Sequence, residues 1–266
     1  MDTPLRVITF NLKRDLPFFR SHRWAQRREI AAELCRRSKA DLIGVQELMP
    51  DMRRDLEELL AGEYAIAGFG RYYGTRHTNE DEHSDILVRL ERAELRYCKT
   101  FWLSNRPEQY GSRGLLAAYP RICTVAEIRL RDSGRCIRVF NTHFDHISGP
   151  ARNLAARIIL QYMQELDLRE PMPKLLMGDL NASYDSRCVR ILRENLHQYP
   201  FRLQDAYEKY DGVRSNTYHR FAGRAGVPST ISSPRRSSRS SPHGSPPFLW
   251  TGNIPRTISR SLPTWY

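Results

Sequence analysis

Short apolar runs alternate along the chain with longer segments in which apolar positions recur at helical spacing. Alternation with a period of two is typical of strands, and apolar residues three or four apart are typical of helices. These patterns predict strands at residues 5–10, 41–46, 64–69, 85–90, 96–103, 122–130, 136–142, 174–177 and 217–221. They predict helices at residues 24–37, 52–60, 151–166 and 188–195.

The longest predicted helix carries an apolar repeat of four residues. Leu154, Ile158, Tyr162 and Leu166 follow one another at this interval, so we expect them to form the stripe that faces the core. Strands outnumber helices, and the long helices stand between strands. This order favours an α/β fold with two sheets covered by helices over a simple doubly wound sheet.

Composition narrows the class of protein. The chain of 266 residues is 40% hydrophobic and 27% charged, which is ordinary for a globular protein. No apolar run approaches the roughly 20 residues needed to span a bilayer, and the start does not resemble a secretory signal. The five cysteines are widely spaced and include no Cys-x-x-Cys pair. We therefore expect reduced thiols and a cytoplasmic location rather than a disulfide framework.

The net charge of +12 is unevenly distributed. Residues 224–266 contain six arginines and no Asp, Glu or Lys, so they carry half of it. Serine and proline are also abundant in this segment, which predicts a domain at 1–223 followed by a disordered basic tail at 224–266. A modestly basic domain suits a polyanionic substrate, although charge alone favours an ordinary solvated surface.

Polar side chains stand where apolar strands are predicted to end. They are Asn11, Glu47, His143, Asp145, Asp179 and Asn181. Taken singly, Asn and Asp at strand ends are turn formers more often than ligands. Together, these groups suit phosphate-ester hydrolysis, in which carboxylates hold a divalent cation and activate water while an imidazole or amide stabilises added charge. The sequence contains neither a phosphate-loop lysine motif nor a Gly-x-Ser-x-Gly elbow.

Six ordered motifs carry a family resemblance over about 220 residues. They are TFNLKRD (9–15), DLIGVQE (41–47), TFWLSNRPE (100–108), FNTHFDH (140–146), MGDLNAS (177–183) and TYHRF (217–221). With these motifs the chain resembles the endonuclease/exonuclease/phosphatase superfamily, which includes deoxyribonuclease I and exonuclease III. The resemblance implies a four-layer sandwich, with two β-sheets face to face, helices outside and a metal-dependent site at one edge.

The resemblance also implies roles for the strand-end residues. Glu47 would be the principal ligand of Mg²⁺ or Mn²⁺, and Asn11 its neighbour at the metal. His143 would stabilise the pentacovalent phosphate, Asp179 would activate water, and Asn181 would hold the phosphate.

Other positions resemble the family less closely. Asp145 and His146 would support these groups or contact substrate, and His219 would line the cleft. Relatives usually have Asn-Pro before the strand at residue 86, where this chain has Ser84-Asp85. This departure puts a contact to substrate in doubt.

The end of the chain departs further from the family. Similar proteins carry an Ile-Asp-Tyr-Ile strand and finish with Tyr-Pro-Ser-Asp-His-Phe-Pro-Val, whose Asp-His pair completes the site. Neither segment is present. If the third base of each codon is grouped with the first two of the next, residues 228–232 permit Ile-Asp-Tyr-Ile. In the same frame, residues 252–266 permit Lys-Tyr-Pro-Ser-Asp-His-Phe-Pro-Val. We therefore hypothesise that the chain from about Arg224 onward is a frameshifted translation, the alternative being an authentic basic tail.

The predicted function follows from the motifs of residues 1–223 and from the absence of the family's final Asp-His segment. We expect a metal-dependent hydrolase of phosphate esters, either a phosphodiesterase or nuclease or a phosphatase, impaired by the loss of the Asp-His pair. We also expect one sheet to lack its last strand, leaving an unpaired edge. The modest charge of the body slightly favours a small phosphodiester, with nucleic acid as another substrate. The rival interpretation is a non-catalytic nucleic-acid-binding protein or an inactive pseudogene product.

Overall fold

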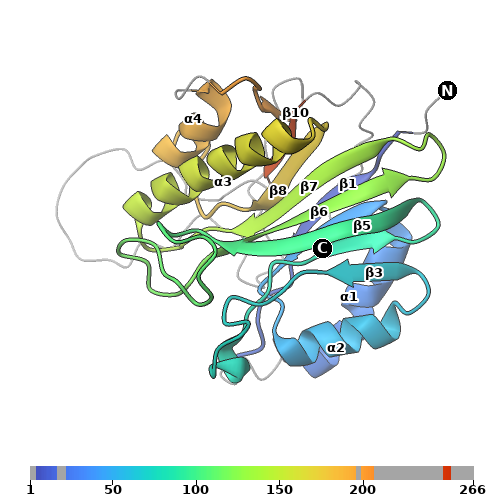
Figure 1. Ribbon diagram of the computed structural model, residues 1–266. Coiled ribbons are helices and arrows are strands. Elements are labelled where there is room, and N and C mark those ends of the chain that lie inside the picture. Colours follow the sequence, from blue (N-terminus) through green and yellow to red (C-terminus); the bar gives the residue numbers. More distant parts are fainter. Residues whose placement is uncertain (1–3, 17–21, 196–198, 207–247, 253–266) are drawn as a thin grey trace, which may run out of the picture.

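Two β-sheets pack face to face, and a pair of helices covers the outer side of each (Figure 1). The computed structural model describes residues 4–16, 22–195, 199–206 and 248–252. These layers confirm the predicted α/β sandwich of two sheets with helices outside.

Within the described residues, the first sheet has four strands and the second has six. The order in the first sheet is β1 (Val7–Asn11), β2 (Leu42–Gln46), β4 (Ile86–Arg89) and β3 (Tyr64–Ala67). The order in the second is β5 (Ala93–Trp102), β6 (Ile122–Leu130), β7 (Cys136–His143), β8 (Lys174–Asp179), β10 (Phe248–Gly252) and β9 (Gln204–Asp205). The helices are α1 (Trp24–Ser38), α2 (Pro50–Leu59), α3 (Gly149–Arg169) and α4 (Arg187–Glu194), with a short 3₁₀ helix η2 (Thr78–Glu80).

Alternation along the central strands divides the apolar residues between three cores. In β2, Leu42 faces the second sheet, whereas Ile43 and Val45 face α1 and α2. In β8, Leu175 faces the first sheet, whereas Leu176 faces α3 and α4. Because successive side chains of a strand point to opposite faces, a run of apolar residues fills both an inner and an outer core.

Each sheet contains one parallel pair of strands that ends at the same edge of the sandwich. In the first sheet β1 runs parallel to β2, and Asn11 lies opposite Gln46. In the second sheet β7 runs parallel to β8, and His143 lies opposite Asp179. The polar residues at the ends of these strands therefore lie at the same edge of the sandwich, although they come from different sheets.

A buried pair of amides joins the two sheets just inside this edge. Asn141 on β7 is fully buried and donates to the carbonyl oxygens of Val45 (2.9 Å) and Asp85 (2.8 Å) in the first sheet. Gln46 on β2 donates in return to Asn141 Oδ1 at 2.7 Å. A Cβ at Gly44 would lie 2.6 Å from Asn141 Oδ1, so only glycine leaves room for this contact.

The apolar repeat predicted for α3 does not mark its buried face. Tyr162 and Leu166 are buried, but Leu154 and Ile158 are only partly buried, while Ile159 and other residues of α3 fill the core. The α-helix has 3.6 residues per turn, so residues four apart drift by about 40° at each step and leave one face. The helix itself is longer than the predicted span of 151–166.

One strand lies inside the segment that composition predicts to be disordered. Strand β10 pairs antiparallel with β8 and with β9. These five residues form a strand, so the expected unpaired edge at β8 is covered, whereas the disorder predicted for the tail as a whole stays a prediction. Composition averages over the whole tail and overlooks the β-prone Phe-Leu-Trp run. The strand predicted at 217–221 and His219 lie outside the described residues.

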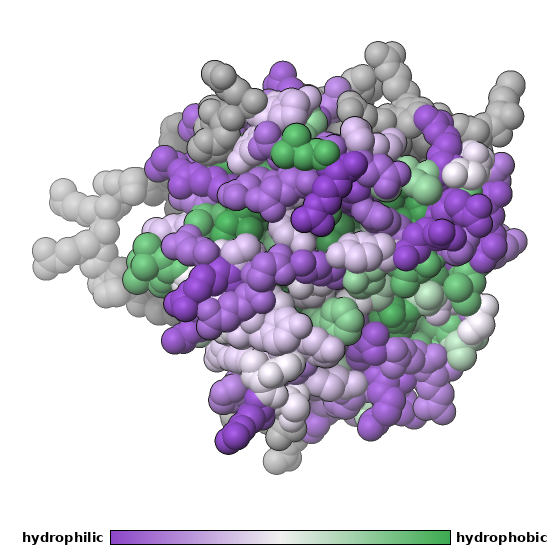
Figure 2. Space-filling model, viewed as in Figure 1, coloured by the Kyte–Doolittle hydropathy of each residue, from purple (hydrophilic) through white to green (hydrophobic). Residues whose placement is uncertain are grey.

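Polar side chains cover most of the face seen in Figure 2, and apolar side chains reach the surface in separate patches. In the part of the chain that the structure describes, every helix is too short or too polar to cross a membrane. The five cysteines are all free, as predicted.

The contact between the sheets predicts a large effect of one substitution. Asn141→Ala leaves two carbonyl groups and the Gln46 amide without their partner in a buried site, so we expect the free energy of unfolding to fall by about 3 kcal/mol. Urea denaturation followed by circular dichroism measures the change. Asn105→Ala, at an exposed position, is the matched control and should stay within about 0.5 kcal/mol of wild type. An equally small change for Asn141→Ala would contradict this role of the amide pair.

Candidate active site

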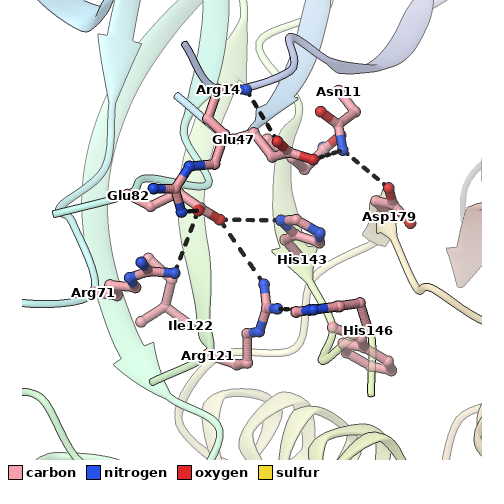
Figure 3. A network of polar contacts seen from close by, with 12 residues as sticks. Asn11, Arg14, Glu47, Arg71, Glu82, Arg121, Ile122, His143, His146 and Asp179 are labelled. Atoms are coloured by element: carbon pink, nitrogen blue, oxygen red, sulfur yellow. Dashed lines mark hydrogen bonds and ion pairs between the residues drawn. The ribbon is translucent and has the colours of Figure 1, made fainter. Parts of the chain in front are cut away.

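The predicted strand-end residues meet across the two sheets. The side-chain nitrogen of Asn11, at the end of β1, lies 3.0 Å from Glu47 Oε1 and 3.0 Å from Asp179 Oδ2 (Figure 3). Glu47 follows β2 of the first sheet, whereas Asp179 ends β8 of the second. One amide thus holds together two carboxylates that are 132 positions apart in the chain.

Glu47 is held by its backbone conformation as well as by its neighbours. Its φ of 55° lies in the left-handed region, which is uncommon for a residue other than glycine. Its second carboxylate oxygen accepts a hydrogen bond from the backbone N–H of Arg14 at 3.0 Å and lies 3.5 Å from Lys13 Nζ. These contacts compensate the strained turn and fix the carboxylate at the sheet edge.

His143 ends β7 and is oriented by a carboxylate that the strand patterns did not reveal. Its Nδ1 lies 3.2 Å from Glu82 Oε1, and both side chains are at least nine-tenths buried. Glu82 follows η2 in the loop before β4. Because Nδ1 faces Glu82, the other ring nitrogen of His143, Nε2, is left for a different partner.

Glu82 lies among positive charges at the centre of the network in Figure 3. Its carboxylate oxygens are 3.3 Å from Arg71 Nη1, 3.8 Å from Arg121 Nη1 and 3.9 Å from Arg14 Nη1. Burial alone would raise the pKa of Glu82, but the hydrogen bond with His143 and the charges of His143, Arg71 and Arg121 lower it to about 2. Glu82 is therefore ionised throughout the physiological range.

Arg121 connects Glu82 with Asp145 and His146, which follow β7. It precedes β6, whose antiparallel pairing with β7 brings its start to the same edge. Arg121 Nη2 lies 3.0 Å from His146 Nδ1, and Arg121 Nε lies 3.6 Å from Asp145 Oδ2. Burial and the charge of Arg121 lower the pKa of His146, so the neutral imidazole that can accept from Arg121 is favoured.

Asp145 organises the turn that leads into α3. Its Oδ1 accepts hydrogen bonds from the backbone N–H groups of Ile147 (2.9 Å) and Ser148 (2.7 Å). Ser148 in turn caps α3 by accepting from Ala151 N at 3.1 Å. Burial would raise the pKa of Asp145, but these backbone hydrogen bonds and the nearby Arg121 lower it. Asp145 thus contacts Arg121 and orders the turn, and its predicted role beside the catalytic groups stays a prediction.

Asp179 and Asn181 lie on one tight turn after β8. Asp179 Oδ1 accepts from the backbone N–H of Asn181 at 2.9 Å, and Asn181 adopts a φ of 45°. The side-chain nitrogen of Asn181 donates to the carbonyl oxygen of Phe144 at 3.0 Å. The turn therefore presents Asp179 at the sheet edge, and the predicted phosphate contact of Asn181 stays a prediction.

The Ser84-Asp85 departure lies on the side of α2. Asp85 is buried, with Oδ2 at 2.8 Å from Arg53 Nε on α2 and Oδ1 at 3.2 Å from His83 Nδ1. Asp85 raises the pKa of His83 although burial opposes the rise. Ser84 is also buried. At this position the chain therefore has an ion pair between the loop and the helix.

The oxygen-rich edge fits a magnesium-type cation better than a metal held in a protein cage. Within the described residues, no group of three or more His, Cys, Asp or Glu side chains is placed to hold a metal ion. Mg²⁺ commonly uses one or two carboxylates and keeps waters and substrate oxygens as its other ligands. Glu47 and Asp179, bridged by Asn11, supply such carboxylates.

The strand-end pattern identified residues at the ends of four strands that build this edge, β1, β2, β7 and β8. It missed the charged residues that the neighbouring loops contribute. Glu82 lies outside any strand, and Arg121 stands before a strand rather than after one. A search of strand beginnings as well as ends would have found Arg121, because antiparallel neighbours reverse direction. His219 lies in the part of the chain that the structure does not describe.

Comparison with known proteins places these features in context. The profile of the Endonuclease/Exonuclease/phosphatase family matches residues 8–263. The matched range continues past residue 223, although the predicted domain boundary there stays a prediction. A search of curated proteins finds no match.

Solved structures show the same architecture. An endonuclease/exonuclease/phosphatase from Bacteroides vulgatus is 26% identical with a TM-score of 0.77, covering 92% of this chain and 85% of its own. A mannosyl-6-phosphatase from Bacteroides thetaiotaomicron is 26% identical with a TM-score of 0.72, covering 93% and 98%. TDP2 from D. rerio, complexed with a single-strand DNA product, is 15% identical with a TM-score of 0.63, covering 98% and 87%, and shows the fold alone.

The surroundings of Glu82 predict a dependence of stability on pH. Its folded pKa of about 2 lies below the ordinary 4.5, so its contribution is present above about pH 4.5 and is lost as the pH falls towards 2. The shift corresponds to about 3 kcal/mol. Glu82→Gln should lower stability at neutral pH and weaken the loss on acidification, measured by urea unfolding across this range. Glu58→Gln, at an exposed position on α2, should leave the profile unchanged. An unaltered profile for Glu82→Gln would contradict the charge network.

Proposed function

The chain belongs to the endonuclease/exonuclease/phosphatase family, and from this premise we propose that it hydrolyses phosphate esters with a divalent cation beside Glu47. The observation that carries the proposal is the convergence of Glu47 and Asp179 on the amide of Asn11, which joins carboxylates from both sheets. Family membership supports a phosphoesterase of the nuclease or phosphatase type.

The proposed cation is Mg²⁺ or Mn²⁺, and Glu47 would hold it. When bound, such an ion polarises the phosphoryl oxygens and neutralises their growing charge. Asn11 holds Glu47 and Asp179 together through its side-chain nitrogen. That Asn11 is also a direct ligand of the cation is part of the proposal. The matching chemistry of the donors supports this assignment, because oxygen ligands are the ones Mg²⁺ prefers.

Asp179 is the proposed base. Its Oδ1 accepts from the backbone of Asn181, and its Oδ2 accepts from Asn11, so both oxygens are oriented. An oriented carboxylate can take a proton from a water whose oxygen attacks phosphorus as the bond to the ester oxygen breaks. Asn181, two residues later on the same turn, is proposed to hold the phosphate.

His143 is the proposed stabiliser of charge on the phosphate. Its Nδ1 is engaged by Glu82, which fixes the ring and leaves Nε2 to donate to a phosphoryl oxygen. Arg121 and Arg71 balance the charge of Glu82, so the histidine is held without an uncompensated buried anion.

The relatives support phosphate monoesters and diesters as substrate classes. One neighbour that is 26% identical is a mannosyl-6-phosphatase, and the family by its name includes both nucleases and phosphatases. For this chain we propose the shared chemistry, cleavage of a phosphorus–oxygen ester bond. The free cysteines are compatible with the proposed cytoplasmic location.

A non-catalytic nucleic-acid-binding protein is the competing candidate, favoured by the basic tail. Its binding would weaken with salt and would not respond to EDTA. A phosphoesterase would instead lose turnover in EDTA and regain it with Mg²⁺ or Mn²⁺.

We further propose that the chain from about Arg224 is frameshifted and that the printed sequence therefore has reduced activity. Support comes from the genetic code alone, because both missing family segments can be read in one shifted frame and in the right order. Sequencing the gene across codons 215 to 235, with the intact mass of the native protein, tests this directly.

Restoring the shifted frame should raise activity strongly. The restored chain would regain the Asp-His pair, and loss of one member of a catalytic unit commonly lowers rate by about 10³-fold or more. Turnover of bis-p-nitrophenyl phosphate with Mg²⁺ measures the gain. A further variant of the restored chain, with Ala in place of the restored histidine, should return to the level of the printed chain. Equal rates for all three would contradict the frameshift proposal.

Removing the carboxylates should abolish turnover without unfolding the protein. In the frame-restored chain, Glu47→Gln weakens the cation site and Asp179→Asn removes the base, so each should lower kcat by about 10³-fold or more. Glu58→Gln should keep full activity because Glu58 lies on an exposed face of α2. The assay is bis-p-nitrophenyl phosphate hydrolysis with and without EDTA, and circular dichroism checks folding. Full rate in either site variant would overturn the site assignment.

A further inference from the structure

Exposed aromatic side chains gather on two loops beside the candidate site. The loops are residues 69–77, between β3 and η2, and residues 104–121, between β5 and β6; together we name them the aromatic lobe. Large aromatic side chains on the lobe that are more than one-third exposed are Phe69, Tyr73, Tyr110 and Tyr119. Single exposed aromatic residues are normal on a protein surface, whereas a cluster of four indicates a binding surface.

The rings form a connected series. The centroids of Phe69 and Tyr73 are 4.5 Å apart, and those of Tyr73 and Tyr110 are 5.6 Å apart. Tyr110 also lies 5.2 Å from the buried Trp102 on β5. The exposed rings are therefore anchored on the core of the sheet and extend outward from it.

Close packing makes the lobe a preformed surface. Gly74 adopts a φ of 72°, and a Cβ there would lie 2.4 Å from the ring of Tyr110, so the two loops contact each other tightly. Trp102 Nε1 donates to the carbonyl oxygen of Arg71 at 2.7 Å, which ties the first loop to β5. A surface that is already ordered binds a ligand without a large entropic cost.

Arg71 links the lobe to the candidate site. Its guanidinium lies 4.7 Å from the ring centre of Tyr119 and 5.5 Å from that of Tyr72. The same group is 3.3 Å from Glu82, which orients His143. A ligand whose phosphate lies at His143 would therefore have the lobe beside it.

The lobe is also strongly basic. Its two loops contain five arginines and one acidic residue, Glu108, which pairs with Lys99 at 2.7 Å. Arg76, Arg106 and Arg113 are exposed. Within the described residues, no ion pair joins any of these three to an acidic side chain. Exposed rings interleaved with uncompensated positive charge match a chain that carries both flat groups and phosphates.

We propose that the aromatic lobe binds single-stranded nucleic acid, with bases on Tyr73 and Tyr110 and flanking phosphates near Arg76 and Arg106. This inference rests on the proposed function and names polynucleotides as its substrate class. A sugar phosphate offers one ring and one phosphate, which would leave the outer rings and arginines of the lobe unused. A single strand repeats both groups along its length and can use the whole surface.

Binding by the full chain tests the inference separately from catalysis. The probe is a short fluorescein-labelled oligothymidylate, and anisotropy gives Kd in EDTA, where turnover is suppressed. Tyr73→Ala and Tyr110→Ala should each raise Kd by about 10-fold, because each removes a stacking surface for a base. Tyr97→Ala, at an exposed position on β5, is the matched control and should not change Kd. Tyr110→Leu keeps apolar packing on Trp102 and should weaken binding similarly.

Salt dependence separates the lobe from the basic tail. Arg76→Gln and Arg106→Gln should each reduce the slope of log Kd against log salt by about 0.7, whereas Arg96→Gln on β5 should not. If the tyrosine variants bind the oligonucleotide with the same Kd as the wild-type chain, binding is assigned to the tail and the inference is overturned. Displacement of the oligonucleotide by millimolar glucose 6-phosphate would overturn it in favour of a carbohydrate site. If binding behaves as expected while the frame-restored chain fails to hydrolyse bis-p-nitrophenyl phosphate, the proposed function alone fails.

Discussion

The contact between Gln46 and Asn141 is the constraint on which the site depends. The two amides bond across an interface that is built mainly of apolar side chains. The hydrophobic effect is non-directional, whereas a hydrogen bond requires its two partners at a fixed distance and is lost when they separate. Glu47 follows Gln46 directly, and His143 lies two residues after Asn141. The amide pair therefore sets the spacing between the halves of the site.

Charge balance around Glu82 is the second requirement of the same edge. A single buried carboxylate orients His143 and is itself compensated by arginines from three different segments. Burial alone would raise the pKa of Glu82, and the hydrogen bond with His143 together with the charges of His143, Arg71 and Arg121 overcomes this effect. The same arginines connect the edge outward, because Arg121 reaches His146 and Arg71 lies under Tyr119. The orientation of His143 and the shape of the neighbouring aromatic lobe thus depend on the same arginines.

In the second sheet, a strand from near the end of the chain pairs with β8. Strand β8 would expose an unpaired edge if nothing followed it, and β10 occupies this position between β8 and β9. Backbone hydrogen bonds require only an extended segment of β-prone residues, so they are weakly specific for sequence. A catalytic Asp-His pair requires particular side chains. Pairing of β10 therefore has no bearing on whether the chemistry of the family's last segment is present.

The sequence by itself predicted the two-sheet sandwich and the order of strands and α-helices from β1 to α4, and it placed Asn11, Glu47, His143 and Asp179 at strand ends. These features could be predicted because apolar periodicity and motif spacing are local properties. Only the tertiary structure decided which face of α3 is buried and which loop residues join the site. Glu82 and Arg121 carry no periodic signal, and their partners lie 61 and 25 positions away in the chain. Contacts at such separations arise from the stacking of sheets and from strand order, which local patterns do not encode.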